Sequence, residues 1–86
     1  MKILVIRLTS MGDVILTTPL FSFLKIRYPD SSITFITDPA YEELFSGDPR
    51  LVKVIAFRKN GTIDDSLLKT EWDLVIDLQN NHRSAF

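Results

Sequence analysis

The sequence contains no cysteine among its 86 residues. Disulfides, thiolate metal sites and cysteine nucleophiles are therefore excluded. The apolar runs have the length of strands, and none reaches the roughly 20 residues that a membrane-spanning helix requires. A secretory signal with its charged start and apolar run is also missing, so the chain is predicted to be cytoplasmic. With a net charge of -1, the sequence gives no electrostatic reason to expect a nucleic-acid partner.

Glycine is also sparse, with three in the chain, and the nucleotide-binding fingerprint G-x-G-x-x-G is missing. Gly12 stands alone in the first polar turn, and Asp13 beside it would put negative charge where a pyrophosphate should sit. Asp38 follows the second predicted strand, where a ribose-binding acid could lie, but the adjacent Pro39 favours a helix cap instead. These residues argue against a dinucleotide-binding domain.

The stretch from Ile3 to Asp13 is the most informative part of the chain. Ile3–Ile6 is an apolar run without alternation, which predicts a strand covered on both faces inside a parallel sheet. Thr9–Gly12 interrupts the run, and the apolar spacing that follows predicts an amphipathic helix. In open α/β sheets, ligands bind beyond the carboxyl ends of the strands. Asp13 lies at this edge and is the first candidate for a functional residue.

The first helix is expected to begin at Asp13 or the residue before it and to end at Tyr28. Pro19 allows two forms of this segment. Either Asp13 caps one helix that bends at Pro19, or a short turn precedes a main helix with Thr18 as N-cap and Pro19 at N1. A single bent helix is the preferred prediction.

The rest of the chain predicts strands alternating with short helices. Strands are expected at Ile33–Thr37, Leu51–Phe57 and Trp72–Leu78, short helices at Pro39–Phe45 and Ile63–Lys69, and a basic turn at 58–61. This alternation predicts an α/β fold with a three-layer Rossmann-like parallel sheet in the strand order 3-2-1-4. The residues after Leu78 resemble a strand-end loop entering a helix that is cut off. We therefore expect a piece of a larger protein, with self-association through the exposed sheet edge as a further expectation.

Two strand-end segments, LTSMGDVILTTP and DLVIDLQNNHRSA, resemble the glycosyltransferase family 9 heptosyltransferases of lipopolysaccharide core synthesis. In the first segment the likeness lies in Ser10, Met11, Gly12, Asp13, Thr17, Thr18 and Pro19. Gly47–Phe57 and Asp73–Gln79 are similar to the third and fourth strand regions of the family. Asn80 departs from the family, which usually has Gly there, whereas Arg83 and Ser84 fit its pattern.

The resemblance implies an inverting, metal-independent GT-B glycosyltransferase that moves heptose from ADP-heptose to the Kdo or heptose of a lipid-anchored lipopolysaccharide precursor. Residues 1–86 then form a truncated N-terminal, acceptor-binding Rossmann-like domain. No cofactor is implied, and the nucleotide sugar is held by a C-terminal domain that is absent here, so the fragment alone is expected to be inactive. Because the acceptor is amphiphilic, peripheral contact with the inner face of the inner membrane is also implied.

The same resemblance makes Asp13 the catalytic base that takes a proton from the acceptor hydroxyl. A carboxyl group with an ordinary pKa of about 3.9 is a weak base, so we expect partial desolvation to raise the pKa of Asp13. The simpler alternative is an N-cap that satisfies amides of the first helical turn. The residue alone favours the cap, whereas the surrounding motif favours catalysis.

Eight further residues are predicted to contact the acceptor: Thr9, Ser10, Met11, Gly12, Arg58, Lys59, Gln79 and Arg83. For Gln79 and its strand neighbour Asp77, hydrogen bonds to loop amides are an equally good explanation, and each basic residue could be an ordinary solvated charge. The lone His82 has no spaced partner, so no metal site is predicted. The alternative function is a noncatalytic α/β binding or oligomerisation module in which Asp13 is only a cap.

Overall fold

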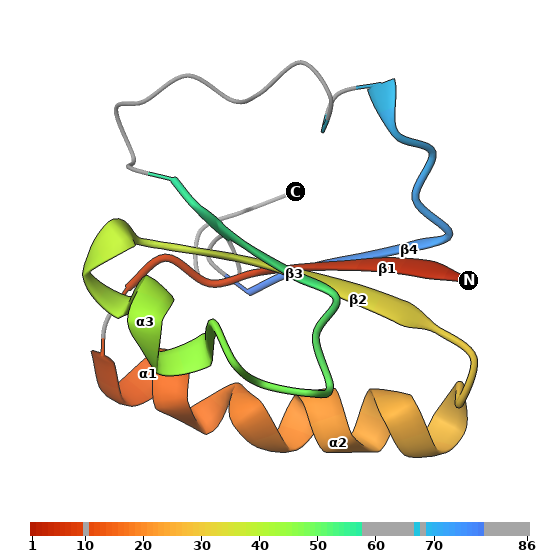
Figure 1. Ribbon diagram of the computed structural model, residues 1–86, viewed down its shortest axis with the longest axis horizontal. Coiled ribbons are helices and arrows are strands. Elements are labelled where there is room, and N and C mark those ends of the chain that lie inside the picture. The colour runs from red at the N-terminus through yellow and green to blue at the C-terminus, as the bar shows by residue number, and fades with distance from the viewer. Residues whose placement is uncertain (10, 58–66, 68, 79–86) are drawn as a thin grey trace.

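A computed structural model describes residues 1–9, 11–57, 67 and 69–78 of the chain (Figure 1). Its elements, in chain order, are β1 (Lys2–Ile6), α1 (Met11–Leu16), α2 (Thr18–Arg27), β2 (Ser32–Thr37), the 3₁₀ helix η1 (Pro39–Tyr41), α3 (Glu42–Phe45), β3 (Lys53–Ala56) and β4 (Leu74–Asp77). The third and fourth strands are shorter than predicted, whereas the first two agree closely with the apolar runs of the sequence. None of the described helices is long and apolar enough to cross a membrane.

The four strands form one parallel sheet in the order β3-β2-β1-β4, which confirms the predicted topology. The central strand is β1, which pairs with β2 on one side and with β4 on the other. Ile3 and Val5 are fully buried and Leu4 is 7% exposed, so both faces of β1 are covered. The continuous apolar run thus predicted the interior position correctly, because alternation would have been needed for a strand with one wet face.

The helices α1, α2 and α3 lie on the same face of the sheet (Figure 1). Their shared core with β1 and β2 is built around three phenylalanines, Phe21 of α2, Phe35 of β2 and Phe45 of α3. The rings meet edge to face, with centroid distances of 5.0 Å for Phe21–Phe35, 6.1 Å for Phe21–Phe45 and 5.0 Å for Phe35–Phe45. This geometry suits the ring quadrupoles, so the aromatic cluster fixes how both helices sit on the sheet.

The opposite face of the sheet carries a second, smaller core. Leu4, Leu8 and Ile36 are buried there, and Leu67 and Trp72 are among the side chains that pack against them. The predicted helix at Ile63–Lys69 falls mostly outside the described residues, although Leu67 and Lys69 are helical. The basic turn at 58–61 lies outside them altogether.

The single bent helix that was preferred from the sequence is wrong, because the structure has two helices separated at Thr17. The Thr17 N–H donates to the Val14 carbonyl, three residues back, at 3.1 Å, so the α-helical ladder is interrupted there. The Thr17 hydroxyl donates instead to the Asp13 carbonyl at 2.9 Å. Thr17, and not Thr18, is the N-cap position of α2, and its side chain makes no capping hydrogen bond.

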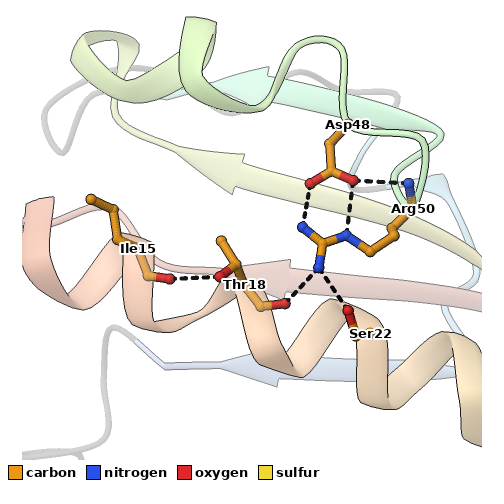
Figure 2. Close-up of polar contacts among 5 residues, drawn as sticks. All are labelled: Ile15, Thr18, Ser22, Asp48 and Arg50. Carbon is orange, nitrogen blue, oxygen red and sulfur yellow. Dashed lines mark hydrogen bonds and ion pairs between the residues drawn. The ribbon is translucent and has the colours of Figure 1, made fainter.

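Arg50 fastens the loop before β3 to α2 (Figure 2). Its guanidinium donates to both carboxylate oxygens of Asp48, from Nε at 2.9 Å and from Nη2 at 2.6 Å. Nη1 donates to the Thr18 carbonyl at 3.1 Å and to the Ser22 hydroxyl at 2.8 Å. A single fork-shaped cation thus joins segments about 30 residues apart in sequence, which a lysine ammonium could not do with the same geometry.

Candidate functional site

The carboxyl edge of the sheet brings together Arg7, which follows β1, and Asp13 in the first turn of α1. Nη2 of Arg7 lies 2.7 Å from Oδ2 of Asp13. The Arg7 main-chain N–H donates to the Ile36 carbonyl at 3.0 Å, and this hydrogen bond continues the β1–β2 ladder by one residue. The main chain of Arg7 is therefore fixed by the sheet, whereas the Asp13 carboxylate belongs to the helix that follows the turn.

A pocket of about 410 Å³ opens at this edge. Its lining consists of Arg7, Asp13, Leu16, Thr17, Leu20 and Leu78. The ion pair supplies the charge of the pocket, and three leucines give it apolar walls. Such a combination can seat a ligand with both apolar and hydroxylated surfaces while presenting a carboxylate to one of its polar groups.

Asp13 occupies the third position of α1, so the prediction that Asp13 is the capping residue before the helix is wrong. A carboxylate in the first turn is still favoured there by the partial positive charge of the helix start. The Asp13 side chain is 50% exposed. The side chain is therefore accessible to a ligand and only partly shielded from water. The raised pKa that was expected for a general base stays a prediction.

Arg7 is a site residue that was missed in the sequence prediction. Its side chain is only 16% exposed, and Nη1 donates to the Leu78 carbonyl just beyond β4. Nε is buried and has no hydrogen-bond partner among the described residues. The signal was present in the sequence, since an arginine directly after a buried apolar strand must find a partner for its charge.

The other predicted acceptor residues are only partly covered by the structure. Thr9, Met11 and Gly12 are exposed, and none of the three is among the described residues that line the pocket. The remaining predicted residues, Ser10, Arg58, Lys59, Gln79 and Arg83, lie outside the described part of the chain. Contact of these eight residues with an acceptor stays a prediction.

Asp38, the alternative ribose ligand, caps the 3₁₀ helix η1. Its Oδ1 accepts a hydrogen bond from the Ala40 N–H at 2.9 Å, and Pro39 takes the first helical position. The predicted helix cap is thus confirmed. Within the described residues, no group of three or more His, Cys, Asp or Glu side chains could hold a metal ion.

The fold and the pocket define a parallel α/β unit with a charged site at the carboxyl ends of its strands. A solved glycosyltransferase of family 9 from Veillonella parvula DSM 2008 is similar to it, with a TM-score of 0.78 and 31% identity over 91% of this chain and 26% of that chain. The heptosyltransferase WaaC of E. coli, solved with ADP, is also similar, with a TM-score of 0.77 and 24% identity over 90% of this chain and 27% of that chain.

These likenesses confirm the predicted fold class, a parallel α/β sheet that matches part of a GT-B glycosyltransferase. The chain spans about a quarter of the length of each of these two solved structures. At 24% identity, the likeness to the E. coli protein shows a shared fold alone. No family model matches the chain, and no curated protein sequence matches it.

Proposed function

We propose that this chain is the acceptor-binding part of an inverting family 9 glycosyltransferase. The observation that carries the proposal is the likeness to the Veillonella parvula enzyme, at 31% identity over 91% of the chain. The proposed reaction transfers heptose from ADP-heptose to the Kdo or heptose of the lipopolysaccharide inner core. ADP, the nucleotide named with the E. coli heptosyltransferase structure, supports the choice of donor.

In this proposal Asp13 is the general base. Its carboxylate takes the proton of an acceptor hydroxyl as that oxygen forms a bond to the anomeric carbon of the donor. The bond from this carbon to the diphosphate breaks at the same time, and the nucleoside diphosphate leaves with the electron pair. Attack from the face opposite the leaving group inverts the anomeric configuration. A positioned base of this kind contributes about 10²–10⁴-fold to the rate.

The location of Asp13 supports this role. Its half-exposed carboxylate faces a pocket at the carboxyl ends of β1 and β4, where open α/β sheets bind their ligands. The nucleotide sugar is held, in this proposal, by a second domain outside residues 1–86, so that the 86-residue chain alone does not turn over. A lipid-linked acceptor would bring the site to the inner face of the cytoplasmic membrane, as a peripheral contact.

The test is a transfer assay on the native protein that contains these residues, whose mass is first measured to establish its length. Purified protein is supplied with ADP-heptose and a Kdo-terminated lipid acceptor, and the release of ADP is followed. Asp13→Asn is expected to lower kcat by about 10²–10⁴-fold with the fold intact by circular dichroism. Asp30→Asn provides a matched control, because Asp30 is an exposed carboxylate in the turn before β2.

Two results would contradict the proposal. Transfer by Asp13→Asn at the wild-type rate would remove Asp13 from catalysis. Absence of transfer by the native protein, combined with stable self-association, would favour the noncatalytic module.

A further inference from the structure

We infer that Arg7 is a positioning residue for the Asp13 carboxylate, set between the carboxyl ends of β1 and β4 and the first turn of α1. This inference rests on the proposed function, because it assigns Arg7 a task in the same reaction. Arg7 does not reach the reacting atoms in this assignment. It acts through Asp13.

The two side chains of the ion pair differ in their exposure to solvent. Arg7 is 16% exposed whereas Asp13 is 50% exposed, so the cation is the fixed end of the pair and the carboxylate is the end that faces solvent. A solvent-exposed ion pair contributes little to stability, because water screens the attraction and two side chains lose rotamer freedom. Here the rotamer freedom of Arg7 is already removed by burial, which leaves Asp13 as the side chain that the contact orders.

The two terminal nitrogens of the Arg7 guanidinium contact different partners. Nη2 contacts Asp13 at 2.7 Å, while Nη1 donates to the main-chain carbonyl of Leu78. The guanidinium is planar and its N–H directions are fixed. The hydrogen bond to the Leu78 carbonyl therefore sets the plane of the guanidinium, and with it the direction from which Nη2 contacts the Asp13 carboxylate. The orientation of the carboxylate is thereby coupled to the end of β4, a strand that lies more than 60 residues further along the chain.

The orientation of the Asp13 carboxylate matters for a ligand bound in the pocket. Arg7 and Asp13 line the same pocket as Leu16 and Leu20, so a ligand bound there meets a carboxylate whose direction is set by Arg7. General base catalysis requires the carboxylate within hydrogen-bond reach of the proton that it removes. A displacement of about 1 Å can cost about 10²-fold in rate, so an Asp13 carboxylate that has lost the Arg7 contact would be a poorer base even with the residue itself intact.

The test compares Arg7→Met and Arg7→Lys in the native protein, with kcat and KM for the acceptor measured in the transfer assay. Arg7→Met keeps an apolar stem of similar length and removes both contacts. It is expected to lower kcat by about 10–10²-fold with KM for the acceptor changed by less than about threefold. Arg7→Lys keeps the charge but has a single nitrogen in place of the two that contact Asp13 and Leu78, so it is expected to restore part of kcat.

Arg50→Met is the matched control, since Arg50 also forms a partly buried ion pair, with Asp48 at 2.6 Å, and neither residue lines the pocket. Its loss is expected to lower the melting temperature while kcat per folded molecule stays at the wild-type value. A drop in kcat of equal size in Arg50→Met would show that general loosening, and not positioning, explains the Arg7 variants.

A double variant separates this inference from the proposed function. If Arg7 acts through Asp13, Arg7→Met added to Asp13→Asn should lower kcat no further. A full additional loss would overturn the positioning role, as would an Arg7→Met variant that raises KM at unchanged kcat, because Arg7 would then bind the acceptor directly. If Arg7→Met fails to fold, the same comparison is made with Arg7→Lys. Full activity of Asp13→Asn alone would overturn the proposed function itself.

Discussion

The side-chain hydroxyl of Thr18 donates a hydrogen bond of 2.9 Å to the main-chain carbonyl of Ile15 (Figure 2). In an uninterrupted α-helix that carbonyl would accept from the N–H of residue 19, but Pro19 has no N–H to give. The hydroxyl therefore replaces the donor that proline removes. Together with the hydrogen bond from the Thr17 hydroxyl to the Asp13 carbonyl, it carries the chain from α1 into α2 without leaving these two carbonyls unpaired.

Because the Thr18 hydroxyl replaces the N–H that Pro19 lacks, the effects of mutating Thr18 and Pro19 on the free energy of unfolding should be coupled. Thr18→Val keeps the shape of the side chain and removes the hydroxyl, at an expected cost of about 0.5–1 kcal/mol in the free energy of unfolding. In a Pro19→Ala background the backbone N–H is restored, so the cost of Thr18→Val should vanish. Urea denaturation of the four proteins measures the coupling. An equal cost in both backgrounds would show that the hydroxyl does not substitute for the missing N–H.

The Asp48–Arg50 pair predicts an acid-sensitive part of the stability. The side-chain hydrogen bond with Arg50 lowers the pKa of Asp48 below its ordinary value of 3.8 and outweighs the opposing effect of burial. Since the unfolded chain holds this proton more tightly, the pair stabilises the fold fully above about pH 4, and its contribution is lost as pH falls through the lower folded pKa. At neutral pH, Asp48→Asn should cost about 2 kcal/mol.

Urea denaturation from neutral pH to about pH 2 at constant ionic strength checks this prediction. The stability difference between the wild type and Asp48→Asn should shrink only in the acid range. Asp30→Asn, at an exposed turn position, controls for the loss of one carboxylate. A difference that stays constant down to the lowest pH would contradict the linkage.

The sequence was most informative where an interaction is local or follows from burial. The apolar run at Ile3–Ile6 was enough to predict a central strand, and the alternation of elements was enough for the sheet order. The break at Thr17 was not predictable from apolar spacing, because Val14 before the break and Phe21 after it are buried in the same core. What changes at the break is the choice of hydrogen-bond acceptor, and the spacing of side chains does not record that choice.

In the candidate site, too, local features were predictable from the sequence and contacts between distant segments were not. Asp13 was placed correctly at the carboxyl edge of the sheet, because strand, turn and helix follow one another directly in the sequence. Its pairing with Arg7 was missed because the spacing of apolar residues does not indicate an ion pair between residues on either side of a turn. The contact of Arg7 with Leu78 depends on the parallel pairing of β1 with β4, which places distant residues side by side.

The aromatic cluster predicts a sharp contrast between two neighbouring phenylalanines of α2. Phe21 is fully buried against Phe35 and Phe45, whereas Phe23 is 59% exposed. Phe21→Ala should cost about 3–5 kcal/mol, and Phe21→Leu about 1 kcal/mol because most of the volume is kept. Phe23→Ala should change stability by no more than about 0.5 kcal/mol. Similar losses at both positions would indicate that Phe23 is also buried in the native protein.

Asp38 allows the cap and the nucleotide-ligand explanations to be separated. Its backbone is extended, with φ of -66° and ψ of 146°, and its carboxylate oxygen accepts from the Ala40 N–H at 2.9 Å. Asp38→Ala should therefore cost about 1 kcal/mol in the free energy of unfolding, whereas Asp38→Ser, which keeps an acceptor oxygen, should cost only a few tenths. In the transfer assay, KM for ADP-heptose should be the same in both variants as in the wild type, because a capping carboxylate has no contact with the donor. A raised KM for ADP-heptose in Asp38→Ala at unchanged stability would contradict the capping role and would support Asp38 as a ribose ligand.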